Sequence, residues 1–162
     1  MGIRYLKIVL VAFVALLGLF YAIHNVVNLD EAYGFVAYVV GMENNEAYPS
    51  AMVPAFHSPL LIWMTLAIII LGESATGLLA AKGAWDLWTS RKAHAAEFNA
   101  SKTYAILGCG AAIVVWFGLF IVVGGAFFQM WQHELGAASI EGAFQAVGAS
   151  GIVLLFVNAA DD

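Results

Sequence analysis

Glu73 is the residue whose type and position could most readily support chemistry, because it is the only charged residue deep within a long apolar run. It lies roughly 21 Å along a helix that begins at position 59, in the third nearest the basic loop. An ionised carboxylate there costs about 2.5–3.5 kcal/mol, so we expect it to be neutral, paired or beside water. Lys7 and Lys102 could reach it from the nearer boundary. We predict that Glu73 forms a hydrogen bond or an ion pair with another helix, helped by Ser74 and Thr76. A proton or substrate site is the alternative.

Three histidines, His24, His57 and His133, fall near the ends of apolar runs on one predicted side of the membrane. Three methionines lie in the same regions, namely Met42, Met52 and Met130. Imidazole nitrogen and thioether sulfur can ligate haem iron or copper, although no pair here has a tight ligand spacing. We therefore predict no metal site and no cofactor, and keep a haem- or copper-binding redox protein as an alternative.

No residue pattern typical of an enzyme is present. The triplet Gly108-Cys109-Gly110 lies inside an apolar run rather than after a strand, so it does not predict a phosphate-binding loop. No nucleophile elbow with a base and an orienting residue can be found. We predict that the protein is not an enzyme.

Four long apolar runs must position these residues. Of the 162 residues, 63% are hydrophobic and only 10% are charged, whereas soluble proteins carry about a quarter charged residues. We predict an all-α integral membrane protein, a four-transmembrane-helix bundle forming one membrane domain over residues 1–162, with spans at about 5–23, 59–81, 104–131 and 143–159. The stretch 33–42 is apolar but too short to cross, and it predicts a short interfacial helix.

The six Lys and Arg residues all fall within positions 4–7 and 82–102, and the two remaining loops carry only acidic charges. The positive-inside rule therefore predicts that the N and C termini are both cytoplasmic. The net charge of -5 comes mainly from acids in the two outer loops, which argues against nucleic acid as a partner.

Small residues in the third run predict close approach of helices. These positions are Gly108, Gly118, Gly124 and Gly125, and Trp131 follows at the end of the run. We expect them to pack within the bundle, with a surface for another subunit as the alternative.

The order of several residues is distinctive. Gly124-Gly125 is followed by Met130-Trp131-Gln132, which is an unusual order at the end of a membrane helix. Further positions in the same pattern are Asn25, Phe35-Val36, Val39, Met42, His57, Ile69-Ile70, Glu73, Gly83-Ala84, Phe98-Asn99, Lys102 and Ala143-Phe144. With these residues, most of the chain resembles the family of predicted small integral membrane proteins called domain of unknown function 2165. The resemblance implies a four-span, multi-pass protein of the bacterial cytoplasmic (inner) membrane and implies no enzymatic activity.

Two segments depart from the family pattern. Where the family has His-Val-Leu-Ser-Met-Asp, this chain has the segment 38–43, Tyr-Val-Val-Gly-Met-Glu. Where the family has Gly-Gly-Glu-Trp-Phe, this chain has the segment 124–128, Gly-Gly-Ala-Phe-Phe. An imidazole and a carboxylate of the family pattern are therefore absent here.

The scarcity of polar residues within the runs argues against a carrier or an ion channel. We predict a non-catalytic accessory subunit that packs within a larger energy-converting complex of the bacterial inner membrane, respiratory or photosynthetic. Its expected partners are other integral membrane subunits and bound lipids. The alternatives are the redox protein described above and a small transporter or sensor that works through Glu73.

Overall fold

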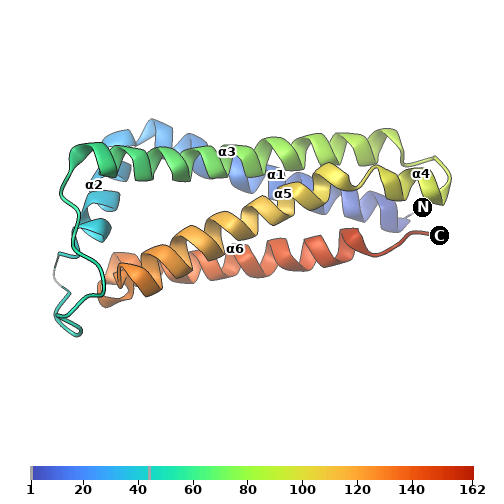
Figure 1. The fold of residues 1–162 in the computed structure, drawn as a ribbon. Helices are drawn as coiled ribbons and strands as arrows, with labels where there is room; N and C mark the ends of the chain where they lie inside the picture. Colours follow the sequence, from blue (N-terminus) through green and yellow to red (C-terminus); the bar gives the residue numbers. More distant parts are fainter. Residues whose placement is uncertain (1, 44) are drawn as a thin grey trace.

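The chain forms a bundle of long helices, shown in Figure 1. The computed structural model describes residues 2–43 and 45–162, and no strand occurs among them. Four stretches are long and apolar enough to cross a membrane, namely Gly2–Val27, Pro59–Thr89, Ala95–Phe127 and Glu134–Asn158. The prediction of an all-helical, four-span protein is therefore confirmed.

The helices follow one another in antiparallel order. They are α1 (Gly2–Val27), α2 (Leu29–Val40), α3 (Pro59–Thr89), α4 (Ala95–Ala100), α5 (Thr103–Ile113), η1 (Val114–Phe127), η2 (Met130–Gln132) and α6 (Glu134–Asn158). Both chain termini lie near α4, at what we call the terminal end, while α2 lies at the opposite end, the α2 end (Figure 1).

Helix bounds differ from the sequence prediction most at the end of α3, which reaches Thr89 rather than about 81, and at the start of α6. α6 begins at Glu134 rather than near 143, so it includes a polar first turn in which a carboxylate favours the positive helix N-terminus. The preceding helix ends at Phe127 rather than near 131, because Gln129 adopts a left-handed conformation with φ of 57°. The short helix predicted at 33–42 is present as α2, which begins at Leu29 and ends at Val40.

Glycines set the closest helix contacts. A Cβ on Gly18 of α1 would lie 2.6 Å from the backbone nitrogen of Gly77 in α3. A Cβ on Gly108 of α5 would lie 2.5 Å from the backbone nitrogen of Ala80. Larger side chains would therefore separate α3 from both neighbours, and close backbone approach is a general means of packing membrane helices.

The third span changes its winding partway along the bundle. After α5, the segment η1 is a π-helix of 14 residues, and its last bond joins the amide of Phe128 to the carbonyl of Val123, five residues earlier, at 3.0 Å. Such winding is rare and mostly confined to single turns.

α3 lies close to α5 near the terminal end and farther from η1 toward the α2 end (Figure 1). α2 packs into the space that this divergence leaves. Its buried residues form a separate apolar core with α3 and the end of the third span, comprising Val36, Val39, Val40, Ile62, Leu66, Phe128 and Met130. The protein therefore has a main core along the bundle and a second core at the α2 end.

Candidate functional site

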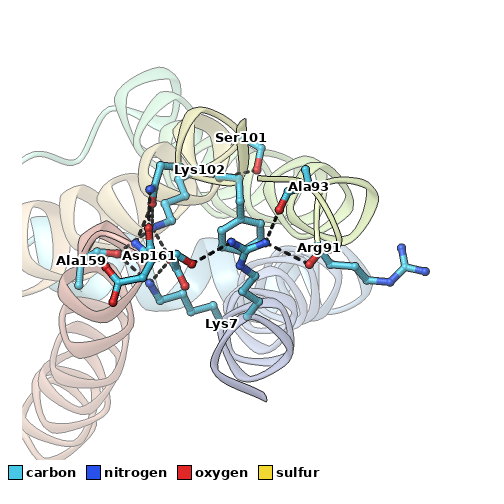
Figure 2. Close-up of polar contacts among 11 residues, drawn as sticks. Lys7, Arg91, Ala93, Ser101, Lys102, Ala159 and Asp161 are labelled. Carbon is cyan, nitrogen blue, oxygen red and sulfur yellow. Dashed lines mark hydrogen bonds and ion pairs between the residues drawn. The ribbon is translucent and has the colours of Figure 1, made fainter. Parts of the chain in front are cut away.

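The largest polar cluster lies at the terminal end and joins α1, α4, the turn between α4 and α5, and the segment after α6 (Figure 2). Lys7 and Lys102 each approach Asp161 Oδ2 to 2.6 Å, and their side chains are 2% and 4% exposed. Both ammonium groups also donate to the carbonyl of Ala159, at 2.8 and 2.7 Å. We call these four residues together with Asn99 the terminal clamp.

Asn99 fixes the backbone of the clamped segment. Its Nδ2 donates to the carbonyl of Asp161 at 3.0 Å, and the amide of Asp161 donates to Asn99 Oδ1 at 3.0 Å. Lys102 donates to the same Oδ1 at 2.6 Å. The backbone of the segment after α6 is thus tied to α4 through Asn99, while the carboxylate of Asp161 binds Lys7 of α1 and Lys102.

Arg4 makes a second set of contacts beside the clamp. Its guanidinium donates to the carbonyl of Ala93 at 2.7 Å and to that of Arg91 at 3.3 Å, both in the loop after α3 (Figure 2). The same group lies over the ring of Phe98, 4.5 Å from its centre. A cation is favourable here because the carbonyls near a helix C-terminus lack intrahelical partners.

The charges of the clamp support one another. Burial opposes ionisation of Asp161, but hydrogen bonds and attraction from Lys102 and Lys7 outweigh it and lower the pKa of the carboxyl below 3.8. The three N–H groups of Lys102 are matched by three acceptors, so this ammonium has no donor left for a ligand. The terminal clamp therefore binds segments of the chain to one another.

A second polar pair lies within the bundle. Glu73 is near the middle of α3 and its side chain is fully buried. Its Oε2 accepts a hydrogen bond from Asn25 Nδ2 of α1 at 2.8 Å, while Oε1 has no hydrogen-bond partner among the described residues. Carboxyl groups at this depth are expensive and commonly face partners inside a bundle.

The prediction that Lys7, Lys102 and Thr76 would be partners of the Glu73 carboxyl was wrong. Lys7 and Lys102 bind Asp161 at the terminal end instead of reaching along the span. The hydroxyl of Thr76 donates to the carbonyl of Gly72, at 3.0 Å, rather than to the carboxylate. Glu73 also lies nearer the middle of its helix than its distance from Pro59 suggested, because α3 continues to Thr89.

The three histidines lie in different surroundings. His24 and His57 are exposed, whereas the Nε2 of His133 lies 3.0 Å from Asn45 Oδ1 and its ring packs against Tyr38. Burial lowers the pKa of His133. Within residues 2–43 and 45–162, no three His, Cys, Asp or Glu side chains form a group that could hold a metal ion.

The predicted packing residues do not share one surface. Gly108 contacts Ala80, whereas Gly124 and Gly125 face Met130 and Ile140. A Cβ on Gly118 would meet no atom within 4 Å, so this position makes no close contact in the described chain. Trp131 lies outside the span, is 42% exposed and packs edge-on against Tyr48.

Sequence reasoning missed four residues of these polar clusters, namely Arg4, Asn25, Asn99 and Asp161. Asp161 had a usable signal, since an even number of spans returns the end of the chain to the side of the basic residues. Asn25, Asn99 and Lys102 belong to the pattern shared with the family, but the pattern does not pair them in space.

Searches for similar proteins agree with the membrane architecture. No curated protein and no solved structure matches the chain. The sequence profile of one family matches residues 3–160, nearly the whole chain, and the family is described as a predicted small integral membrane protein, DUF2165. The chain is therefore an integral multi-pass membrane protein that belongs to the DUF2165 family.

Proposed function

We propose that this protein is a non-catalytic accessory subunit of an energy-converting complex, respiratory or photosynthetic, in the bacterial inner membrane. The observation that carries the proposal is a notch on the outward face of α6. Gly148 is exposed between Phe144 and Ile152, which are 68% and 70% exposed. A Cβ on Gly148 would meet no atom within 4 Å, so the notch is free for a neighbouring helix.

The polar residues of the bundle support the same proposal. The clamp lysines bind the segment after α6, and the Asn25 amide binds Glu73. These contacts join helices and the segment after α6 within the same chain. A carrier instead places polar groups around broken helices at the midplane.

The test is purification of the tagged protein from its native membrane in mild detergent, with identification of the proteins that accompany it. We expect stoichiometric recovery with one membrane complex. Gly148→Trp should remove these companions, because the indole fills the notch. Gly142→Trp is the matched control, since Gly142 on the same helix is also open but lies about 120° away around the axis.

Recovery of the wild-type protein without companions would contradict the proposal. Equal loss of companions in Gly148→Trp and Gly142→Trp would contradict the notch as the contact. The melting temperature of each purified variant should match that of the wild type, which separates loss of a partner from loss of the fold.

A second candidate, a small transporter or sensor, is favoured by the Oε1 of Glu73, which has no hydrogen-bond partner within residues 2–43 and 45–162. In this case the carboxyl exchanges a proton that crosses the bundle. Purified protein in liposomes should then show pH-dependent flux, and Glu73→Gln should abolish it while the amide oxygen still accepts from Asn25. Flux that is absent in the wild type, or unchanged in Glu73→Gln, excludes this role.

A further inference from the structure

A cavity of about 210 Å³, which we call the wedge cavity, lies between α2, α3 and η1. Its lining comes from the second half of α2, the first half of α3, η1 and the residues that follow η1. The residues of its buried wall include Val36, Val39 and Met130, which are 5%, 6% and 2% exposed. The cavity is distinct from the terminal clamp and from the α6 notch.

The residues that line the cavity favour a hydrocarbon ligand over a polar one. Among the described residues that line it, Thr65 alone carries a hydroxyl or other hydrogen-bonding side chain, and this hydroxyl already donates to the carbonyl of Leu61 at 2.9 Å. A polar ring or headgroup inside would lose its hydrogen bonds to water and gain none. Apolar cavities of about 150 Å³ stay dry and take up ligands the size of benzene, so this space is large enough for part of a hydrocarbon chain.

The cavity opens sideways to the bilayer. The most exposed residues of its lining are Ile68 of α3, by 53%, and Val123 of η1, by 39%. Both belong to membrane-spanning stretches, so the opening faces lipid. The adjoining wall is π-helical, a winding that is frequent at functional sites.

The charges at the α2 end indicate which kind of lipid headgroup is favoured on this side of the membrane. Positions 8–81 and 103–162 contain no Lys or Arg, whereas the first turn of α2 carries Asp30 and Glu31. A purely anionic headgroup would meet like charge on this side, while a headgroup that carries an amine would meet carboxylates.

We propose that the wedge cavity binds one acyl chain of an amine-bearing phospholipid, such as phosphatidylethanolamine, from the leaflet on the α2 side. The chain enters between Ile68 and Val123 and ends against α2. Its headgroup stays at the membrane surface near the first turn of α2. Filling the wedge joins α2 to the divergent ends of α3 and η1.

The test uses the full-length protein in vesicles of phosphatidylethanolamine and phosphatidylglycerol. The probe is phosphatidylethanolamine with a diazirine midway along one acyl chain, activated by light, and labelled residues are mapped by mass spectrometry. We expect labels on Val36, Val39 or Met130, which free lipid cannot reach because they are buried. Labels confined to lipid-exposed residues would overturn the proposal.

A variant pair sharpens the test. Val39→Phe narrows the cavity and should reduce labelling of Val36 and Met130 several-fold, while Val26→Phe, at a position of α1 that is 57% exposed, should leave it unchanged. Unchanged labelling in Val39→Phe would overturn the site. Equal labelling by a phosphatidylglycerol probe, or displacement of the probe by an isoprenoid quinone, would overturn the assignment of the lipid. If Val39→Phe fails to fold, the positions of the labelled residues in the wild-type protein still test the proposal.

Discussion

At the scale of single residues, one carboxylate of this protein is shared by two buried ammonium groups. Asp161 neutralises one unit of charge, and the excess is stabilised by the carbonyl of Ala159, just after α6, and by the amide of Asn99. Helix C-termini favour cations, so the position of the clamp beyond α6 reduces the cost of burying both lysines.

Asp161→Asn should destabilise the protein by about 3–5 kcal/mol, because it leaves two buried cations without their anion. Thermal unfolding in detergent measures the effect. The control is Asp86→Asn, which breaks the exposed pair with Lys82 and should cost about 0.3–0.5 kcal/mol. Similar melting temperatures for the two variants would contradict the structural role of the clamp.

The same carboxylate predicts a pH dependence. Its pKa in the folded protein lies below the ordinary value of 3.8, so its stabilising contribution is complete above about pH 4 and is lost as the pH falls through the folded pKa. The difference in melting temperature between wild type and Asp161→Asn should stay constant from about pH 7 to about pH 5 and narrow below about pH 4. A difference that grows on acidification would reverse the assigned sign.

Residue types were more predictable than residue pairs. Lys7, Lys102 and Glu73 stand out in the sequence because charges in or near apolar runs are rare. Their partners depend on the rotation and depth of each helix, which the pattern of apolar residues does not define when a helix is apolar on most sides. Asn25 and Asp161 were therefore missed, and the three histidines share an end of the bundle without sharing a site.

At the scale of elements, glycine contacts hold α3 against α5. Gly108→Val should separate the two helices and lower the melting temperature, because its Cβ would lie 2.5 Å from the backbone of Ala80, which cannot move aside easily. Gly110→Val is the control, two residues along the same helix, where a Cβ meets no atom within 4 Å. Equal melting temperatures for both variants would show that this contact is unimportant.

The sequence predicted the four spans, but it did not predict the π-helical winding of η1. Four apolar runs predicted four spans, because only helices satisfy the backbone in hydrocarbon without closing a barrel. The π-helical segment has no signature in the residue types of η1, since the apolar run continues through it unchanged. The early start of α6 was missed for the opposite reason, since its first turns are polar and small.

At the scale of the whole molecule, the ends of the chain share one side of the membrane with the basic residues. In a Cys109→Ala background, Ser50→Cys should react with a membrane-impermeant maleimide added to spheroplasts. Ala96→Cys, in the exposed part of α4, should react only after permeabilisation, as the positive-inside rule predicts. The opposite pattern would invert the proposed orientation.

The span of the terminal clamp has a consequence for biogenesis. Lys7 and Asp161 are 154 positions apart, so their bond cannot form until α6 has been synthesised and inserted. During translation, Lys7 is therefore free to act as an orientation signal, and it is paired with Asp161 only when α6 is in place. The bond therefore distinguishes a chain whose α6 has inserted, with the segment after α6 bound at the terminal end, from a chain in which α6 has not yet inserted.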